Sequence, residues 1–311
     1  MGPVRPSGLA FALRDPLPWK AFAGTVREGE ALGYRAVFLP EIAGRDAVAA
    51  LAALAGETRE LLLGTGVLPM RSRTPMLTAM GAATVQERSG GRLILGIGPG
   101  SVRTGALGEL RRTVLEVRAL LAGEAVGPGR RLSLVPDPPV PIWVSALGPR
   151  ACRLAGEVAD GALLNWCTPE RVAEARGAIA AAAEAAGRDP AAIALAVYVR
   201  CWAGEDEEAG LAALRRAAAE YASYPAYRRQ FERMGLGAEA EEAAAAARAG
   251  RPEEALEALV RAVAAFGGSA RERLAAYREA GADLVVAYPV AAGEPEASIR
   301  GTLRALAPSA A

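Results

Sequence analysis

Short apolar runs alternate along the chain with longer segments in which apolar residues recur at helical spacing. Runs that are bounded by Gly or Pro predict strands, and the amphipathic segments predict helices. The predicted strands cover residues 9–13, 36–39, two runs within 61–100, 142–146, 162–165, 193–199 and 284–288. The predicted helices cover residues 18–32, 46–57, 75–88, 107–121, 150–158, 169–186 and 296–306.

The segment 61–100 shows this alternation most clearly. Thr74 followed by Pro75 is typical of a helix start, and Ser89-Gly90-Gly91 is typical of a helix end. A strand, a helix and a strand in this order predict a parallel pair with a crossover helix. Eight such strands, each followed by a helix, favour a closed (β/α)8 TIM barrel over an open doubly wound sheet, which stays as the alternative.

The predicted barrel accounts for the whole chain as one domain. Residues 1–311 form this single domain, and residues 206–280 are predicted to be a helical insertion between the seventh and eighth strands, because their composition is rich in alanine. Pro and Gly residues at 127–139 predict irregular chain or a short hairpin.

Composition narrows the possible partners. Apolar residues make up 52% of the 311 residues and the formal net charge is +1, so the chain has a large core and no polyanion-binding charge. Nucleic acid is therefore not an expected partner. The apolar runs are shorter than a membrane span and the first residues lack a signal-peptide core, so we expect no membrane association and a cytoplasmic protein.

The cysteine and histidine content limits the catalytic and metal chemistry that the chain can support. Cys152, Cys167 and Cys201 are odd in number and far apart, so they are expected to be reduced and buried, without a metal site. The chain contains no histidine, which excludes His-based triads, His-ligated zinc and the commonest general base. Proton transfer is therefore left to carboxylates, tyrosine, cysteine or solvent.

Ligands of a TIM barrel bind where the strands end, at the carboxyl-terminal mouth. The predicted strand ends define the candidate positions at this mouth, which are Asp15, 40–41, 65–67, 98–101, 146–149, 165–166, 200–202 and Tyr288.

Three motifs at this mouth each have a purely structural interpretation and a functional one. The sequence Gly96-Ile97-Gly98-Pro99-Gly100 lacks the spacing of a dinucleotide fingerprint, and it predicts either a flexible turn or a floor beneath a flat ring. A helix is predicted to begin at Pro149 within the run 145–150. This run is either a simple helix cap or a phosphate site at a helix N-terminus. Glu41 is a candidate general acid, a solvated charge or a partner of Arg45.

The motifs at 63–67, 74–75, 89–92 and 95–100 together resemble the bacterial luciferase-like monooxygenase superfamily. Residues 141–149 and 159–161 resemble the same superfamily, so the likeness is close over about 30–190. Members are (β/α)8 barrels that bind reduced flavin mononucleotide (FMN) or the deazaflavin coenzyme F420 at the mouth. Residues 159–165 look most like the F420-dependent oxidoreductase branch, so the resemblance implies F420, with FMN as the alternative cofactor.

The resemblance also implies roles for individual residues. Gly66-Val67 would be a cis peptide that supports the cofactor ring, residues 98–101 would pass beside the cofactor, and Gly148-Pro149 would hold its phosphate. Glu41 is the predicted catalytic acid. The predicted cofactor-binding residues are Leu39, Thr65, Gly66, Val67, Gly98, Pro99, Gly100, Ser101, Ala146, Leu147, Gly148, Pro149 and Asn165.

Three functions are consistent with these residues. The leading hypothesis is an F420-dependent oxidoreductase that transfers a hydride between the deazaflavin and a small organic substrate. The alternatives are an FMN-dependent monooxygenase and a barrel that binds the cofactor without catalysis. Some F420-dependent dehydrogenases carry Asp-His where this chain has Glu41-Ile42, so alcohol oxidation through that histidine is not expected. A homodimer is expected from the resemblance, with the helices 46–57 and 75–88 as candidate contact faces.

Overall fold

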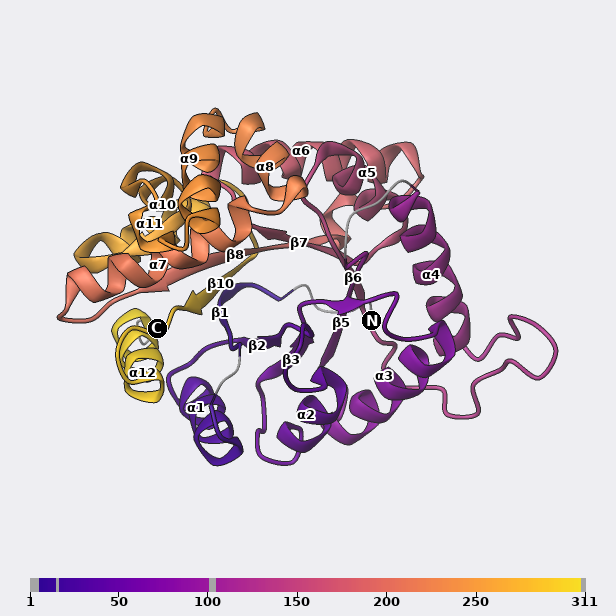
Figure 1. Cartoon of the computed structure of the whole chain (residues 1–311). Helices are drawn as coiled ribbons and strands as arrows, with labels where there is room; N and C mark the ends of the chain where they lie inside the picture. The colour runs from indigo at the N-terminus through magenta and orange to yellow at the C-terminus, as the bar shows by residue number, and fades with distance from the viewer. Residues whose placement is uncertain (1–5, 15–16, 101–104, 309–311) are drawn as a thin grey trace.

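Parallel strands surrounded by helices form the body of the molecule (Figure 1). The structure is a computed structural model, and it describes residues 6–14, 17–100 and 105–308. Asp15 and Ser101, two of the predicted site residues, lie outside the described residues. Within those ranges, no helix combines the length and the apolar character that a membrane crossing requires.

The strands and helices follow the predicted alternation. The strands are β1 (Gly8–Ala12), β2 (Ala36–Leu39), β3 (Leu62–Thr65), β4 (Leu68–Pro69), β5 (Leu93–Gly98), β6 (Ile142–Ser145), β7 (Gly161–Asn165), β8 (Ala194–Trp202), β9 (Ala264–Phe266) and β10 (Leu284–Pro289). The α-helices are α1 (Trp19–Ala31), α2 (Ala47–Leu54), α3 (Pro75–Ser89), α4 (Ala106–Leu121), α5 (Pro149–Val158), α6 (Pro169–Ala185), α7 (Glu207–Ala222), α8 (Pro225–Arg233), α9 (Gly237–Arg248), α10 (Glu257–Val263), α11 (Ala270–Glu279) and α12 (Pro295–Leu306). Short 3₁₀ turns lie at Pro190–Ala192, Pro252–Glu254 and Gly267–Ser269.

The sheet closes into a barrel. The order of the strands is β10-β1-β2-β3-β5-β6-β7-β8, every neighbouring pair is parallel, and β10 also pairs with β8. The predicted TIM barrel is therefore confirmed, and the open-sheet alternative is wrong. β4 adds to β5, and β9 adds to β8, outside the eight strands of the closed ring.

Three groups of buried side chains form the core. The largest group lies between the strands and the outer helices, and it includes Leu39, Ala146 and Cys152. A second group fills the barrel interior with aromatic residues such as Phe38, Trp143 and Tyr198. The third group lies mainly between β8, β9 and the helices α7–α10, so these helices have a small core of their own.

Local signals in the sequence explain where the helices begin. The side chains of Asp46, Thr74 and Thr168 each accept a hydrogen bond from an amide in the first turn of the following helix. Proline stands in the first turn of α3, α5, α6 and α12, where its missing N–H costs no helical hydrogen bond.

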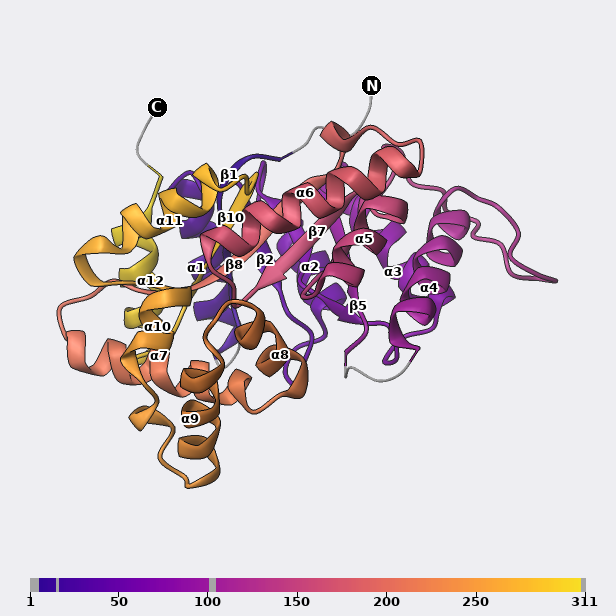
Figure 2. The ribbon, with the colours of Figure 1, turned by 90° about the horizontal axis from the view of Figure 1, so that it is seen from above.

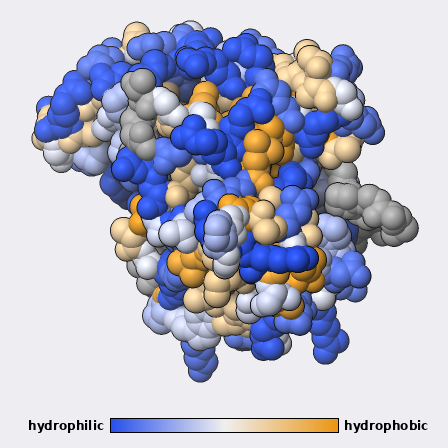
Figure 3. Space-filling model, turned by 90° about the vertical axis from the view of Figure 1, so that its right-hand side faces the viewer, coloured by the Kyte–Doolittle hydropathy of each residue, from blue (hydrophilic) through white to orange (hydrophobic). Residues whose placement is uncertain are grey.

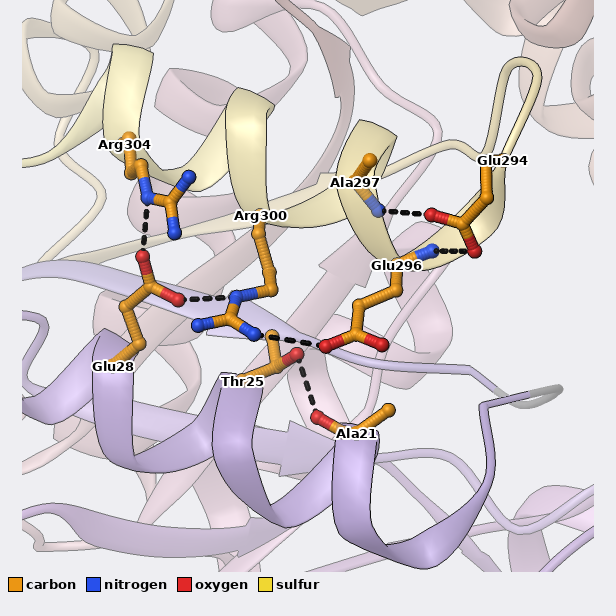
Figure 4. Close-up of polar contacts among 8 residues, drawn as sticks. All are labelled: Ala21, Thr25, Glu28, Glu294, Glu296, Ala297, Arg300 and Arg304. Atoms are coloured by element: carbon orange, nitrogen blue, oxygen red, sulfur yellow. Dashed lines mark hydrogen bonds and ion pairs between the residues drawn. The ribbon is translucent and has the colours of Figure 1, made fainter.

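The last helix packs beside the first and covers the seam of the barrel. Figure 4 shows that the Glu28 carboxylate of α1 pairs with both Arg300 and Arg304 of α12. Arg300 also pairs with Glu296, one turn earlier on α12 (2.8 Å). The Glu294 side chain caps α12 by accepting hydrogen bonds from the amides of Glu296 and Ala297.

The segment 206–280 differs from its predicted all-helical character. It contains β9, whose residues lie parallel to Arg200–Trp202, and this pairing extends β8 three residues beyond the predicted strand end. Figure 2 shows α7–α9 at the edge of the molecule toward which the β7 arrow points. The treatment of 206–280 as one insertion within a single domain stays a prediction.

Residues 127–139 form irregular chain rather than a hairpin, since no strand lies between α4 and β6.

Glu30 ties α1 to the loop before β3, and this contact gives a prediction about acid stability. One carboxylate oxygen accepts hydrogen bonds from the amides of Arg59, Glu60 and Leu61 at 2.8–2.9 Å. Partial burial opposes ionisation, but these hydrogen bonds outweigh it and lower the pKa of Glu30. We expect Glu30→Gln to reduce the free energy of unfolding by about 1–2 kcal/mol at pH 7.

The pH dependence of this effect follows from the sign of the shift. A carboxylate whose pKa is lower in the folded state stabilises the fold above its unfolded pKa of about 4.3, and that contribution is lost as the pH falls through the folded value. Urea denaturation at several pH values should therefore show the variant converging with the parent protein in acid. A difference that is independent of pH would contradict this account.

Candidate functional site at the barrel mouth

The predicted site residues converge at the carboxyl ends of the strands. Leu39 pairs in register with Thr65, Ile97 with Val144, and Asn165 with Tyr198, so the ends of β2 to β8 follow one another around the mouth. The amide of Glu41 donates to the carbonyl of Val67 (3.4 Å), which joins the ends of β2 and β3. The structure thus brings together the predicted residues that it describes, and their roles as ligand contacts stay predictions.

The Gly66-Val67 peptide is cis, as the resemblance implies. The Tyr198 hydroxyl donates a hydrogen bond to the Gly66 carbonyl (3.2 Å), so this peptide is held from inside the barrel by β8. Val67 packs against the apolar interior that contains Phe38 and Tyr198.

Gly64, Gly66 and Gly96 lie against neighbouring protein atoms, which gives a reason for glycine that the sequence did not reveal, and the predicted floor beneath a ring stays a prediction. A Cβ atom at Gly64 would lie 2.3 Å from the Phe38 ring, and one at Gly66 would lie 1.5 Å from the Tyr198 hydroxyl. At Gly96, a Cβ atom would lie 2.1 Å from the Thr65 carbonyl oxygen. Aromatic side chains inside the barrel therefore require glycine at 64 and 66, and the Thr65 backbone requires it at 96.

Gly98 has the same kind of neighbours, and they define one corner of the mouth. A Cβ atom there would lie 2.4 Å from Val67 Cγ2 and 2.7 Å from Ser145 Oγ. The ends of β3, β5 and β6 therefore touch at this corner, where Pro99 and Gly100 follow. Gly100 has φ +68°, a conformation that favours glycine.

Several predicted contact residues have side chains that face away from the mouth. Leu39 and Ala146 belong to the outer core between the barrel and its helices. The Thr65 hydroxyl is fully buried, donates to the Gly96 carbonyl (2.9 Å) and accepts from the Gly96 amide (2.8 Å). Any contact between these three residues and a ligand therefore depends on backbone groups.

The start of α5 has no side-chain cap. Gly148 is the N-cap, and Pro149 occupies the first turn. Within the part of the chain that the structure describes, the amides of Leu147, Gly148 and Arg150 donate to no protein acceptor. Free amides at a helix N-terminus bind phosphate through hydrogen bonds and the helix dipole.

A cation that was not predicted from the sequence lies beside these amides. The Arg233 guanidinium of α8 lies 3.5 Å from the position that a Cβ atom of Gly148 would occupy. Among the described carboxylates, none lies within ion-pair distance of Arg233, which is exposed. No sequence signal connects Arg233 with Gly148, because the two residues are 85 positions apart and meet only through the docking of α8.

Glu41 is held in an ion pair with Arg73. Arg73 Nε and Nη2 donate to the two carboxylate oxygens at 3.1 and 3.2 Å, and the Ala47 amide donates to one of them at 3.0 Å. The two side chains are only 15% and 11% exposed. Arg73 also pairs with Asp46, whose pKa is lowered by the Ala49 amide and by Arg73 in spite of its partial burial. The predicted alternative of a solvated Glu41 charge is therefore wrong.

This ion pair predicts a structural effect of Glu41. We expect Glu41→Gln to reduce the free energy of unfolding by about 2 kcal/mol, because Arg73 would lose its bidentate partner in a mostly buried position. Urea denaturation would measure the change, with Glu205→Gln as an exposed control. Unchanged stability together with lost turnover would instead support the predicted role of Glu41 as an acid.

Three tyrosines lie on β8, α8 and β10, at the side of the mouth away from Glu41. Burial raises the pKa of Tyr198, Tyr227 and Tyr288, so their hydroxyls stay neutral near pH 7. Asn165 Nδ2 donates to the Tyr227 hydroxyl (2.8 Å), and Gln230 Nε2 donates to the Asn165 carbonyl (3.1 Å). α8 is therefore fastened to the end of β7.

The three cysteines are free and buried, as predicted. Burial raises the pKa of the Cys167 and Cys201 thiols to about 12, so neither is a thiolate near neutral pH.

A surface groove of about 620 Å³ lies away from the mouth, on the outer side of α4, α5 and α6. None of the predicted site residues lines this groove.

Comparisons with known proteins bear on this geometry. The family model of the luciferase-like monooxygenases matches residues 6–284. The chain is 34% identical to a 5,10-methylenetetrahydromethanopterin reductase of Methanolobus tindarius over 210 residues, which cover 61% of this chain and 63% of that protein. It is 35% identical to an F420-dependent glucose-6-phosphate dehydrogenase of Beutenbergia cavernae over 181 residues, which cover 49% of this chain and 52% of that protein. The matches thus span about half to two thirds of those relatives.

A solved structure has the same fold over nearly the whole chain. The coenzyme F420-dependent tetrahydromethanopterin reductase of Methanopyrus kandleri superposes with a TM-score of 0.81. The superposition covers 96% of this chain and 97% of that one, with 21% sequence identity. At this identity the likeness concerns the fold alone.

Proposed function

The chain belongs to the luciferase-like monooxygenase family, and from this premise we propose that it is an F420-dependent oxidoreductase. Its reaction would be the transfer of a hydride between the deazaflavin and a small organic substrate. Relatives that are named as F420-dependent enzymes support this cofactor over FMN. The observation that carries the proposal is the start of α5, where free amides and the Arg233 guanidinium lie together at the barrel mouth.

The described residues fit a phosphorylated cofactor at this position. Gly148 leaves the amides of the first turn open, and the nearest atoms to its missing side chain belong to Arg233. Val67, Gly98 and Ser145 meet next to this helix start, so a ring system attached to the phosphate would rest on them. When bound, the deazaflavin supplies or accepts the hydride, and the residues of this chain hold and orient it.

A titration followed by deazaflavin fluorescence tests the proposal. We expect saturable binding of F420 at micromolar concentrations and weaker binding of FMN. Binding of FMN without binding of F420 would overturn the cofactor assignment. Substrate-dependent oxygen consumption with reduced flavin would then favour the monooxygenase alternative, and cofactor binding with no turnover of any candidate substrate would favour the non-catalytic one.

We also propose that the protein forms a homodimer through α2 and α3. Leu77 and Met80 lie one turn apart on α3 and are about half exposed, which leaves an apolar stripe on this helix. Apolar side chains reach the surface in separate patches on the side of the molecule that carries α4 (Figure 3).

The dimer proposal predicts a change of assembly state. Leu77→Glu together with Met80→Glu is expected to yield a monomer, because like charges would face each other across a symmetric interface. Sedimentation velocity would report the mass, and Leu115→Glu on α4 is the matched control for an exposed leucine. A parent protein that sediments as a monomer would overturn this proposal.

A further inference from the structure

A buried arginine without a carboxylate partner lies at the ends of β8 and β10. Arg200 is 5% exposed and is the register partner of Tyr288 on the neighbouring strand. Its Nη1 donates to Asn165 Oδ1 (2.9 Å), and this is its one hydrogen bond to the described residues. No described carboxylate lies within 4.0 Å of its guanidinium.

Aromatic rings surround this guanidinium. Its central carbon lies 3.9 Å from the centroid of the Tyr288 ring, 4.9 Å from that of Trp166 and 5.0 Å from that of Tyr221. Cation–π contacts of this kind contribute about 0.5–2 kcal/mol each, which is less than the cost of burying an unpaired cation. The aromatic cage therefore holds the cation without neutralising it.

Two further donors close to Arg200 have no acceptor. The Tyr288 hydroxyl and Trp166 Nε1 are enclosed and make no hydrogen bond within the described chain, although both residues are more than nine-tenths buried. The unbonded nitrogens of Arg200 are not among these enclosed atoms, so they retain some accessible surface. Glu220, which lies near Tyr288, pairs with Arg14 at 3.3 Å instead.

Arg92 is a second partly buried arginine, and its guanidinium uses all of its hydrogen-bond donors. Arg92 donates five hydrogen bonds, to Thr58 Oγ1 and to the carbonyls of Ala55, Thr58, Leu61 and Ser89. Arg200 has the same five N–H donors and uses one of them for a protein acceptor. The surroundings of Arg200 thus lack an acceptor that carries negative charge.

We infer that Arg200, Tyr288 and Trp166 form a subsite for an oxyanion of the substrate, a carboxylate or a phosphate. This inference rests on the proposed function, since it specifies the substrate class of the same mouth. A planar guanidinium recognises both groups through paired hydrogen bonds.

The position of the subsite assigns the oxyanion to the substrate rather than to the cofactor. Tyr198 links the two regions, since its hydroxyl bonds to Gly66 and its ring lies 5.8 Å from that of Tyr288. The proposed phosphate site at α5 follows β6, whereas Arg200 lies near the end of β8. A substrate placed over Val67 would therefore extend its charged end toward Arg200.

A fluorescence titration of the cofactor-free protein tests the inference. Trp166 contacts Arg200, so we expect saturable changes in tryptophan emission with acetate and with inorganic phosphate at constant ionic strength. Arg200→Gln should weaken this binding about tenfold or more, and Arg200→Lys should retain part of it. Arg229→Gln, which removes an exposed charge on α8, is the matched control and should bind as the parent does.

Two further measurements separate this inference from a structural role and from the proposed function. Arg200→Gln should not lower the melting temperature, because it removes an unpaired buried charge, and a large fall would overturn the inference. Equal anion binding by Arg200→Gln and the parent would overturn it too. F420 should bind Arg200→Gln and the parent alike, so a parent that does not bind F420 refutes the proposed function alone.

Discussion

Replacing Gly148 with leucine is expected to weaken F420 binding by about 100-fold while the protein stays folded. Gly148 has φ −103° and ψ 170°, an extended conformation that any residue adopts. The three atoms nearest to a Cβ atom there belong to Arg233, at 3.5–3.8 Å, which is ordinary contact. The longer side chain would occupy the space in front of the free amides of Leu147 and Arg150, so the phosphate would lose those donors.

Two milder substitutions test whether the loss of binding arises at the proposed phosphate site. Gly148→Ala should have a smaller effect, and Arg233→Gln should weaken binding about tenfold, because it removes one cation and no backbone donor. Circular dichroism and thermal unfolding would check that each variant is folded. An F420 affinity of Gly148→Leu equal to that of the parent would remove the start of α5 from the cofactor site.

Replacing Gly66 with alanine is expected to reduce the free energy of unfolding by about 3 kcal/mol, because the new methyl group overlaps a buried side chain. It would lie 1.5 Å from the Tyr198 hydroxyl and 2.7 Å from the ring carbon that carries it. Tyr198 has no room to retreat, since it packs against Phe38 and Tyr288. Its hydrogen bond to the Gly66 carbonyl would be lost as well.

Two variants control for other causes of this effect. Gly177→Ala on α6 adds a methyl group with no atom within 4 Å, so it should raise stability by as much as about 1 kcal/mol. Tyr198→Leu should recover part of the stability of Gly66→Ala, and a double-mutant cycle by urea denaturation would measure the coupling. A Gly66→Ala protein as stable as the parent would show that the interior adapts to the methyl group.

The sequence predicted most of the fold because each strand and helix has its own local signal. Glycine and proline bound the apolar runs, and Thr74-Pro75 and Thr168-Pro169 mark helix starts that the structure has at the same residues. β9 was not predicted, since Ala264–Phe266 has no strand-like pattern of its own and becomes a strand by pairing with Arg200–Trp202.

The site was harder to predict because its partners come from distant segments. The glycine-rich strands stand out in the sequence, but the contacts of Gly64 with Phe38 and of Gly66 with Tyr198 exist only once the barrel closes. The same holds for Arg73 with Glu41 and for Arg233 with Gly148. Arg200 was predicted at the mouth from the end of a strand, and only the structure reveals that it lacks a charged partner.

The central claim is that F420 binds at this mouth with its phosphate at the start of α5, and a crystal structure of the complex tests it most directly. The account predicts a phosphate within hydrogen-bond distance of the amides of Gly148 and Arg150 and of the Arg233 guanidinium, with the ring against Val67. A cofactor whose phosphate lies away from α5, or whose ring does not contact Val67, would contradict it.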